Sequence, residues 1–73
     1  MTEREYEVVL VPEAEGGFSV FVPELPSVAT QGDSAEEALE MARDAIEGYL
    51  ETVREEGWTV PAVRRERVAV RAA

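Results

Sequence analysis

The chain has 73 residues, of which 45% are apolar and 32% charged, so it fits one small domain and is too short for a two-domain enzyme. A domain of this size buries only about 60% of the surface that its unfolded chain exposes, so its own core stabilises it weakly. Small domains are commonly reinforced by disulfides, a structural metal or self-association, and without Cys or His the first is excluded and the second disfavoured. We therefore expect one domain, residues 1–73, that forms a homodimer or a higher oligomer.

The charge is strongly acidic. Sixteen acids stand against seven bases, all of them Arg, which gives a net charge of -9 and a pI near 4.3. Direct binding to nucleic acid is disfavoured, because it requires Lys or Arg at the phosphates, whereas a basic protein would be attracted. The sequence contains no run of about 18 apolar residues that could span a membrane, and its acidic start lacks the positive region of a signal peptide. We expect a cytoplasmic protein with no membrane partner.

The first half of the chain has the pattern of three strands. Residues 4–11 alternate between apolar and polar positions as far as a proline. The pair Gly16–Gly17 predicts a tight turn into a second strand at 18–22, and hence a hairpin. Two prolines then predict an irregular connection, followed by a short third strand at 28–31.

A long helix follows. Ser34 has the residue type and position of an N-cap, and Glu37 three residues later completes a capping box. Apolar residues then recur at intervals of three and four over 35–56, and Gly57 ends the pattern. Gly48 lies inside this helix, where it costs about 1 kcal/mol relative to Ala, so we expect the helix to approach the sheet closely there.

A last alternating run, residues 65–70, predicts a fourth strand. The order is then β-β-β-α-β, an α+β fold in which one long helix packs on one face of an antiparallel sheet. Three apolar side chains are expected to exceed what one helix can cover and to lie in an oligomer interface: Phe21, Trp58 and Val70.

The residue types exclude most nucleophilic catalysis, because the chain has no His, Cys or Lys to activate a nucleophile. Carboxylates remain as candidates for acid–base chemistry or Mg²⁺ binding, namely Glu13, Glu15, Glu24 and Asp33. With sixteen acids in the chain, solvated surface charge explains them better. A Mg²⁺-dependent nuclease using Glu13, Glu24 and Asp33 is the enzyme alternative; we expect no enzyme, no cofactor and no metal.

Acidic residues also recur at intervals of three or four on the helix face opposite the apolar stripe: Glu40, Asp44, Glu47, Glu51 and Glu55. Neighbouring like charges at these spacings destabilise a helix by roughly 0.2 to 0.5 kcal/mol each, so the pattern does not serve helix stability. Two interpretations stay open, a solubilising face and a docking surface for a basic protein.

The C-terminal residues have the opposite charge. Residues 64–73 contain four arginines and one acid and carry +3, whereas residues 1–63 carry -12. Three interpretations stay open: a contact with nucleic acid, a charged edge strand protected against further pairing, and a contact with the acidic surface of another subunit.

A series of short motifs spans about residues 5–61: Tyr6-x-Val8, Glu15-Gly16-Gly17-Phe18-Ser19-Val20, Pro23-Glu24-Leu25-Pro26, Thr30-Gln31-Gly32-Asp33-Ser34, Glu36-Glu37-Ala38 and Ala45-Ile46-Glu47-Gly48-Tyr49-Leu50. Their order and spacing resemble the HicB antitoxin family. The resemblance implies a partial ribonuclease-H-like fold with three antiparallel strands, a helix and a further strand. The chain departs from the family at Glu24 and Ser27, where Asp and Gly are frequent. It also stops at Ala73, before the C-terminal DNA-binding segment that many members carry, so regulation through DNA is not inferred.

The resemblance implies an antitoxin of a type II toxin-antitoxin system. Its partner would be a small basic HicA-type toxin that cleaves mRNA, and it would act by masking the toxin's RNA-binding and catalytic surface. We expect four acidic helix residues to face this toxin: Asp44, Glu47, Glu51 and Glu55. The alternative is an orphan oligomeric domain with an unknown ligand and no toxin partner.

Overall fold

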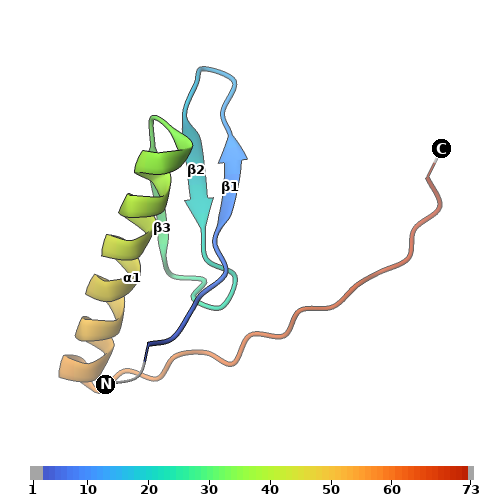
Figure 1. Ribbon diagram of the computed structural model, residues 1–73. Coiled ribbons are helices and arrows are strands. Elements are labelled where there is room, and N and C mark those ends of the chain that lie inside the picture. The colour runs from blue at the N-terminus through green and yellow to red at the C-terminus, as the bar shows by residue number, and fades with distance from the viewer. Residues whose placement is uncertain (1–2, 73) are drawn as a thin grey trace.

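The computed structural model describes residues 3–72. Three strands form one antiparallel sheet in the order β1-β2-β3, and a single long helix lies along one face of it (Figure 1). The α+β class and the order β-β-β-α are confirmed. The elements are β1 (Val9–Pro12), β2 (Phe18–Phe21), β3 (Ala29–Gly32) and α1 (Ala35–Glu56).

The predicted hairpin joins β1 to β2. Gly16 and Gly17 have φ angles of 104° and 79°, values that favour glycine, and they make the turn as expected. The register pairs Leu10 with Val20 and Val20 with Thr30. Because successive strand side chains point to opposite faces, these three share the side on which α1 packs.

The core lies between the sheet and α1. Among residues 3–72 it is formed by seven buried apolar side chains, and the β2–β3 connection contributes Val22, Leu25 and Val28. The helix contributes mainly small residues, which allows its axis to lie close to β2 and β3. The seven are Val20, Val22, Leu25, Val28, Ala38, Ala42 and Ile46.

Both ends of α1 are capped. The Ser34 hydroxyl accepts a hydrogen bond from the Glu37 N–H at 3.1 Å, as expected for an N-cap. The Glu37 carboxylate accepts from the Asp33 N–H at 2.8 Å, one residue earlier than in an ideal capping box. Gly57, with φ of 69°, ends the helix and donates its N–H to the Val53 carbonyl.

The prediction for Gly48 is wrong. Gly48 is exposed, and a Cβ placed on it would have no neighbour within 4 Å, so helix-to-sheet packing does not require it. The close approach occurs at Gly32 instead, where a Cβ would lie 2.5 Å from the Ala38 nitrogen and 2.6 Å from its Cα. The low helix propensity of glycine draws attention to Gly48 in the sequence. Which glycine lies against another backbone depends on the packing of α1 on the sheet, and that glycine is Gly32.

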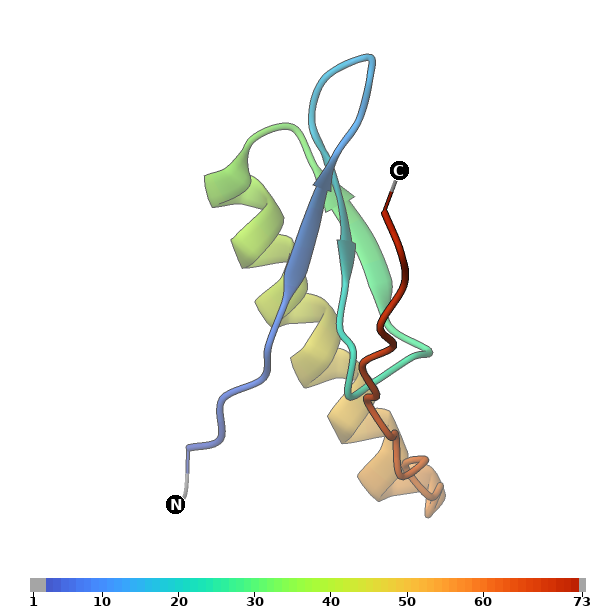
Figure 2. The same ribbon diagram turned by 90° about the vertical axis from the view of Figure 1, so that its right-hand side faces the viewer.

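The expected fourth strand does not form. Residues 58–72 have neither helix nor strand structure. Residues 64–72, here named the C-terminal arm, lead away from the body beyond the sheet (Figures 1 and 2). A strand needs the N–H and C=O groups of a neighbouring strand, and in one copy of the chain the arm has none beside it.

Among the described residues, no helix is both long enough and apolar enough to cross a bilayer.

Candidate functional site: the outer face of helix α1

The outer face of α1 gathers the acidic side chains predicted from the sequence. At 100° per residue they lie within about 80° of one another, on the side opposite the buried Ala38, Ala42 and Ile46. All are exposed to solvent. This acidic face consists of Glu40, Asp44, Glu47, Glu51 and Glu55.

Within residues 3–72, no ion pair joins a base to the acidic face. The ion pairs within 4.0 Å among residues 3–72 join Arg4 to Glu24, Arg64 to Glu66 and Arg65 to Glu7, and none involves α1. The acids recur about once per turn, so they form a row with a spacing of about 5.4 Å along the helix axis. The result is a line of carboxylates presented to solvent on a helix that is capped at both ends.

Gly48 belongs to the same face. It follows Asp44 by four residues and precedes Glu51 by three, which places it beside both on the helix surface. Its backbone carbonyl accepts a hydrogen bond from the Thr52 hydroxyl at 3.0 Å. The missing side chain leaves a notch in the row of acids.

The carboxylates considered for metal binding do not form a site. Glu13 lies in the β1–β2 turn, where it accepts a hydrogen bond from Ser19, and Glu24 lies in the β2–β3 connection. Asp33 lies in the segment between β3 and α1. In residues 3–72 no three acidic side chains come close enough together to hold an ion.

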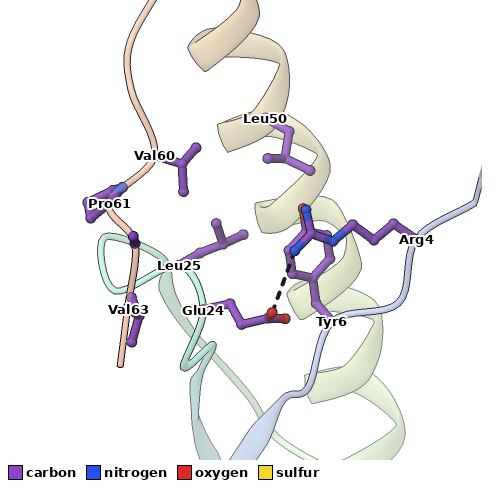
Figure 3. Close-up of a pocket in the computed structure, with 9 residues that line it drawn as sticks. Arg4, Tyr6, Glu24, Leu25, Leu50, Val60, Pro61 and Val63 are labelled. Carbon is purple, nitrogen blue, oxygen red and sulfur yellow. Dashed lines mark ion pairs between the residues drawn. The ribbon is translucent and has the colours of Figure 1, made fainter. Parts of the chain in front are cut away.

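A pocket of about 340 Å³ lies near the C-terminal end of α1 (Figure 3). The Arg4 guanidinium stands 4.8 Å from the centre of the Tyr6 ring and 3.5 Å from the Glu24 carboxylate. Leu50 and Val60 line the pocket from the helix and from the segment after it. These contacts tie the N-terminal segment to the β2–β3 connection, which is a structural role.

The three side chains expected in an oligomer interface lie on different parts of the fold. Phe21 is 47% exposed on the sheet face away from α1, and Trp58 is 55% exposed just after α1. Val70 is 80% exposed on the C-terminal arm. The sequence interpretation missed Val9 and Val11, whose alternation with Val8 and Leu10 already places them on the face of Phe21.

Comparison with known proteins connects this architecture to a family. The sequence profile described as "HicB_like antitoxin of bacterial toxin-antitoxin system" matches residues 6–71. Antitoxin HicB 1 of Photorhabdus laumondii is 46% identical over 56 residues, which are 77% of this chain and 36% of that protein. The UPF0150 protein Ta0767 of Thermoplasma acidophilum is 32% identical over 68 residues, 93% of this chain and 99% of that protein. Antitoxin HicB of Escherichia coli K12 is 44% identical over 41 residues, 56% of this chain and 30% of that protein.

The chain thus spans about a third of the length of the two relatives named as HicB antitoxins, and nearly the full length of the Thermoplasma protein. The profile match covers both the sheet and α1, including the acidic face. The chain belongs to the HicB-like antitoxin family of bacterial toxin-antitoxin systems.

Proposed function

We propose that this protein is an antitoxin that binds a small basic HicA-type toxin in the cytoplasm and masks its RNA-binding and catalytic surface. The observation that carries the proposal is the acidic face of α1, a solvent-exposed row of carboxylates without ion-pair partners in the described residues. A surface that binds RNA presents Lys and Arg to phosphates, so it is complementary to such a row. Asp44, Glu47, Glu51 and Glu55 are the residues assigned to the toxin contact.

Gly48 supports this assignment. A glycine inside a helix costs about 1 kcal/mol relative to Ala, and none of residues 3–72 comes close enough to require one at this position. Close approach of a partner's side chain or backbone to the notch at Gly48, beside Asp44 and Glu51, would explain why this position has no side chain.

The test is a charge reversal on the acidic face. The double variant Glu47→Arg/Glu51→Arg is compared with the parent in suppressing RNA cleavage by a purified HicA-type toxin. Because reversal replaces two attractions with two repulsions, we expect the concentration needed for half suppression to rise at least tenfold. Lowering the salt concentration should strengthen suppression by the parent and weaken suppression by the variant, because a lower salt concentration screens the attraction in one and the repulsion in the other less.

The matched control is Glu13→Arg/Glu15→Arg, which makes the same change of charge in the exposed β1–β2 turn, away from α1. It should suppress the toxin within about threefold of the parent, with circular dichroism showing both variants folded. Equal suppression by the two variants would overturn the assignment to α1. Failure of the unmodified chain to bind or suppress this toxin would overturn the antitoxin proposal and favour the orphan oligomer.

A further inference from the structure

A groove of about 750 Å³ runs along one flank of α1. The helix packs mainly on β3 and β2, and the segment before β1 forms the opposite wall of the groove. The apolar lining comes from Val8 on that segment and from Leu39, Ile46 and Leu50 on the helix. Leu39 is 53% exposed, so the groove presents apolar surface to solvent that the described residues leave uncovered.

The groove and the acidic face are neighbours on the surface of α1. Leu39, Arg43 and Glu47 follow one another at intervals of four residues, so each is turned about 40° further from the buried stripe than the one before. Glu47 lines the groove and also belongs to the acidic face. The groove therefore opens on the helix side of the molecule, where a protein that covers the acidic face also lies over the groove.

The rim of the groove carries charges of both signs around its apolar centre. The charged residues that line it are Glu3, Arg4, Glu5, Arg43 and Glu47. An apolar centre within a polar rim is the usual composition of a protein-binding surface. Because the rim is of mixed charge, it favours one orientation of a bound protein over others.

The acidic face and the groove supply different contributions to binding. Ion pairs between exposed side chains are weakened by water and salt, so the acidic face mainly speeds the encounter with a basic protein. A slow dissociation requires apolar side chains that are removed from water at the centre of the contact. The acidic face offers none, whereas the groove beside it offers Leu39, Leu50 and Val8.

We propose that this groove binds apolar side chains of the same basic toxin whose basic surface covers the acidic face, an inference that rests on the proposed function. The toxin inserts at least one apolar side chain between Leu39 on the helix and Val8 on the N-terminal segment. The acidic face then determines how fast the complex forms, and the groove determines how long it lasts.

The test compares Leu39→Ser with Met41→Ser in binding a purified HicA-type toxin by surface plasmon resonance. Leu39 and Met41 are 53% and 40% exposed, and at about 100° per residue they lie on opposite flanks of α1. Leu and Met have similar helix propensities, so the two changes affect the helix alike. We expect Leu39→Ser to raise the dissociation rate constant at least about tenfold and to leave the association rate constant within about twofold. Met41→Ser should change neither constant by more than about twofold, and circular dichroism should show both variants folded.

Salt distinguishes the groove from the acidic face. Asp44→Arg/Glu51→Arg, at two acids that do not line the groove, should act mainly on the association rate constant, and its effect should shrink between about 50 and 500 mM salt. The effect of Leu39→Ser should stay the same over that range, because salt does not screen apolar contact in this way. Equal dissociation rate constants for Leu39→Ser and Met41→Ser would overturn the inference and leave the acidic face untouched. A parent that does not bind the toxin would overturn the proposed function and this inference with it.

Discussion

Gly32 and Gly48 differ in what surrounds them. Gly32 ends β3 directly against the first turns of α1, where an added Cβ would collide with the backbone of Ala38. Backbone cannot swing away as a flexible side chain can, so the whole helix would have to move. Gly48 has open space around it and lies on the acidic face. One glycine serves the packing of the fold, and the other lowers helix stability without any benefit to packing.

We therefore predict opposite effects of alanine at these positions. Gly32→Ala should lower the free energy of unfolding by about 3 kcal/mol or prevent folding, because overpacking against rigid backbone typically costs 1 to 3 kcal/mol. Gly48→Ala should raise it by up to about 1 kcal/mol, the difference in helix propensity. Urea denaturation followed by circular dichroism measures both. Equal effects would show that the close contact at Gly32 is wrong.

At the scale of the element, the two faces of α1 have different roles. One face buries Ala38, Ala42 and Ile46 against the sheet, and the other presents the acidic face. The row of like charges weakens the helix, and the capping interactions offset part of that cost. Because the caps keep the terminal turns helical, they also keep the acidic side chains near the helix ends in position.

Removal of the N-cap is expected to weaken the whole fold. Ser34→Ala should lower the free energy of unfolding by about 1 kcal/mol, because the Glu37 N–H then loses its acceptor. Ser34→Asp should restore most of the loss, since Asp caps nearly as well as Ser. Ser27→Ala, at an exposed position of the β2–β3 connection, should have an effect within about 0.5 kcal/mol. A Ser34→Ala variant as stable as the Ser27→Ala control would contradict the role of the cap.

At the scale of the whole molecule, the core is small and the C-terminal arm extends away from it. In the part of the chain that the structure describes, seven buried apolar side chains hold the sheet and the helix together, while the principal extents are 48 × 31 × 21 Å. Domains of this length are marginal when they fold alone. We expect association with a second copy to add buried apolar area that the single chain lacks.

The thermal midpoint of unfolding should accordingly depend on protein concentration. Mass action stabilises a folded dimer relative to unfolded monomers, so the midpoint should rise by several degrees between about 1 and 100 µM. A Phe21→Asp/Val70→Asp variant, which places charges at two residues expected in the interface, should unfold at a midpoint that concentration does not change. Differential scanning calorimetry at the two concentrations measures the difference, and a concentration-independent midpoint for the parent would argue against the dimer.

Local patterns in the sequence were sufficient to predict the hairpin, the capped helix over 35–56 and the clustering of acids on one helix face. These features depend on neighbours within a few residues. The fourth strand was predicted from the same kind of alternation, but strand formation needs a partner that alternation cannot specify. The contact at Gly32 likewise depends on where α1 crosses β3, which no local pattern contains. The role of the acidic face in toxin binding follows from family membership and charge, and it stays a prediction.

The two-layer arrangement has a consequence for stoichiometry. The acidic face lies on the outer side of the helical layer, and Val9, Val11 and Phe21 lie on the outer side of the sheet layer, so the two surfaces point in opposite directions (Figure 1). A dimer joined through its sheets would carry its two acidic faces at opposite ends. Each toxin molecule would then bind without crowding the other, and one assembly would hold two toxins at once. Association through the sheet would leave the acidic face free to bind a partner.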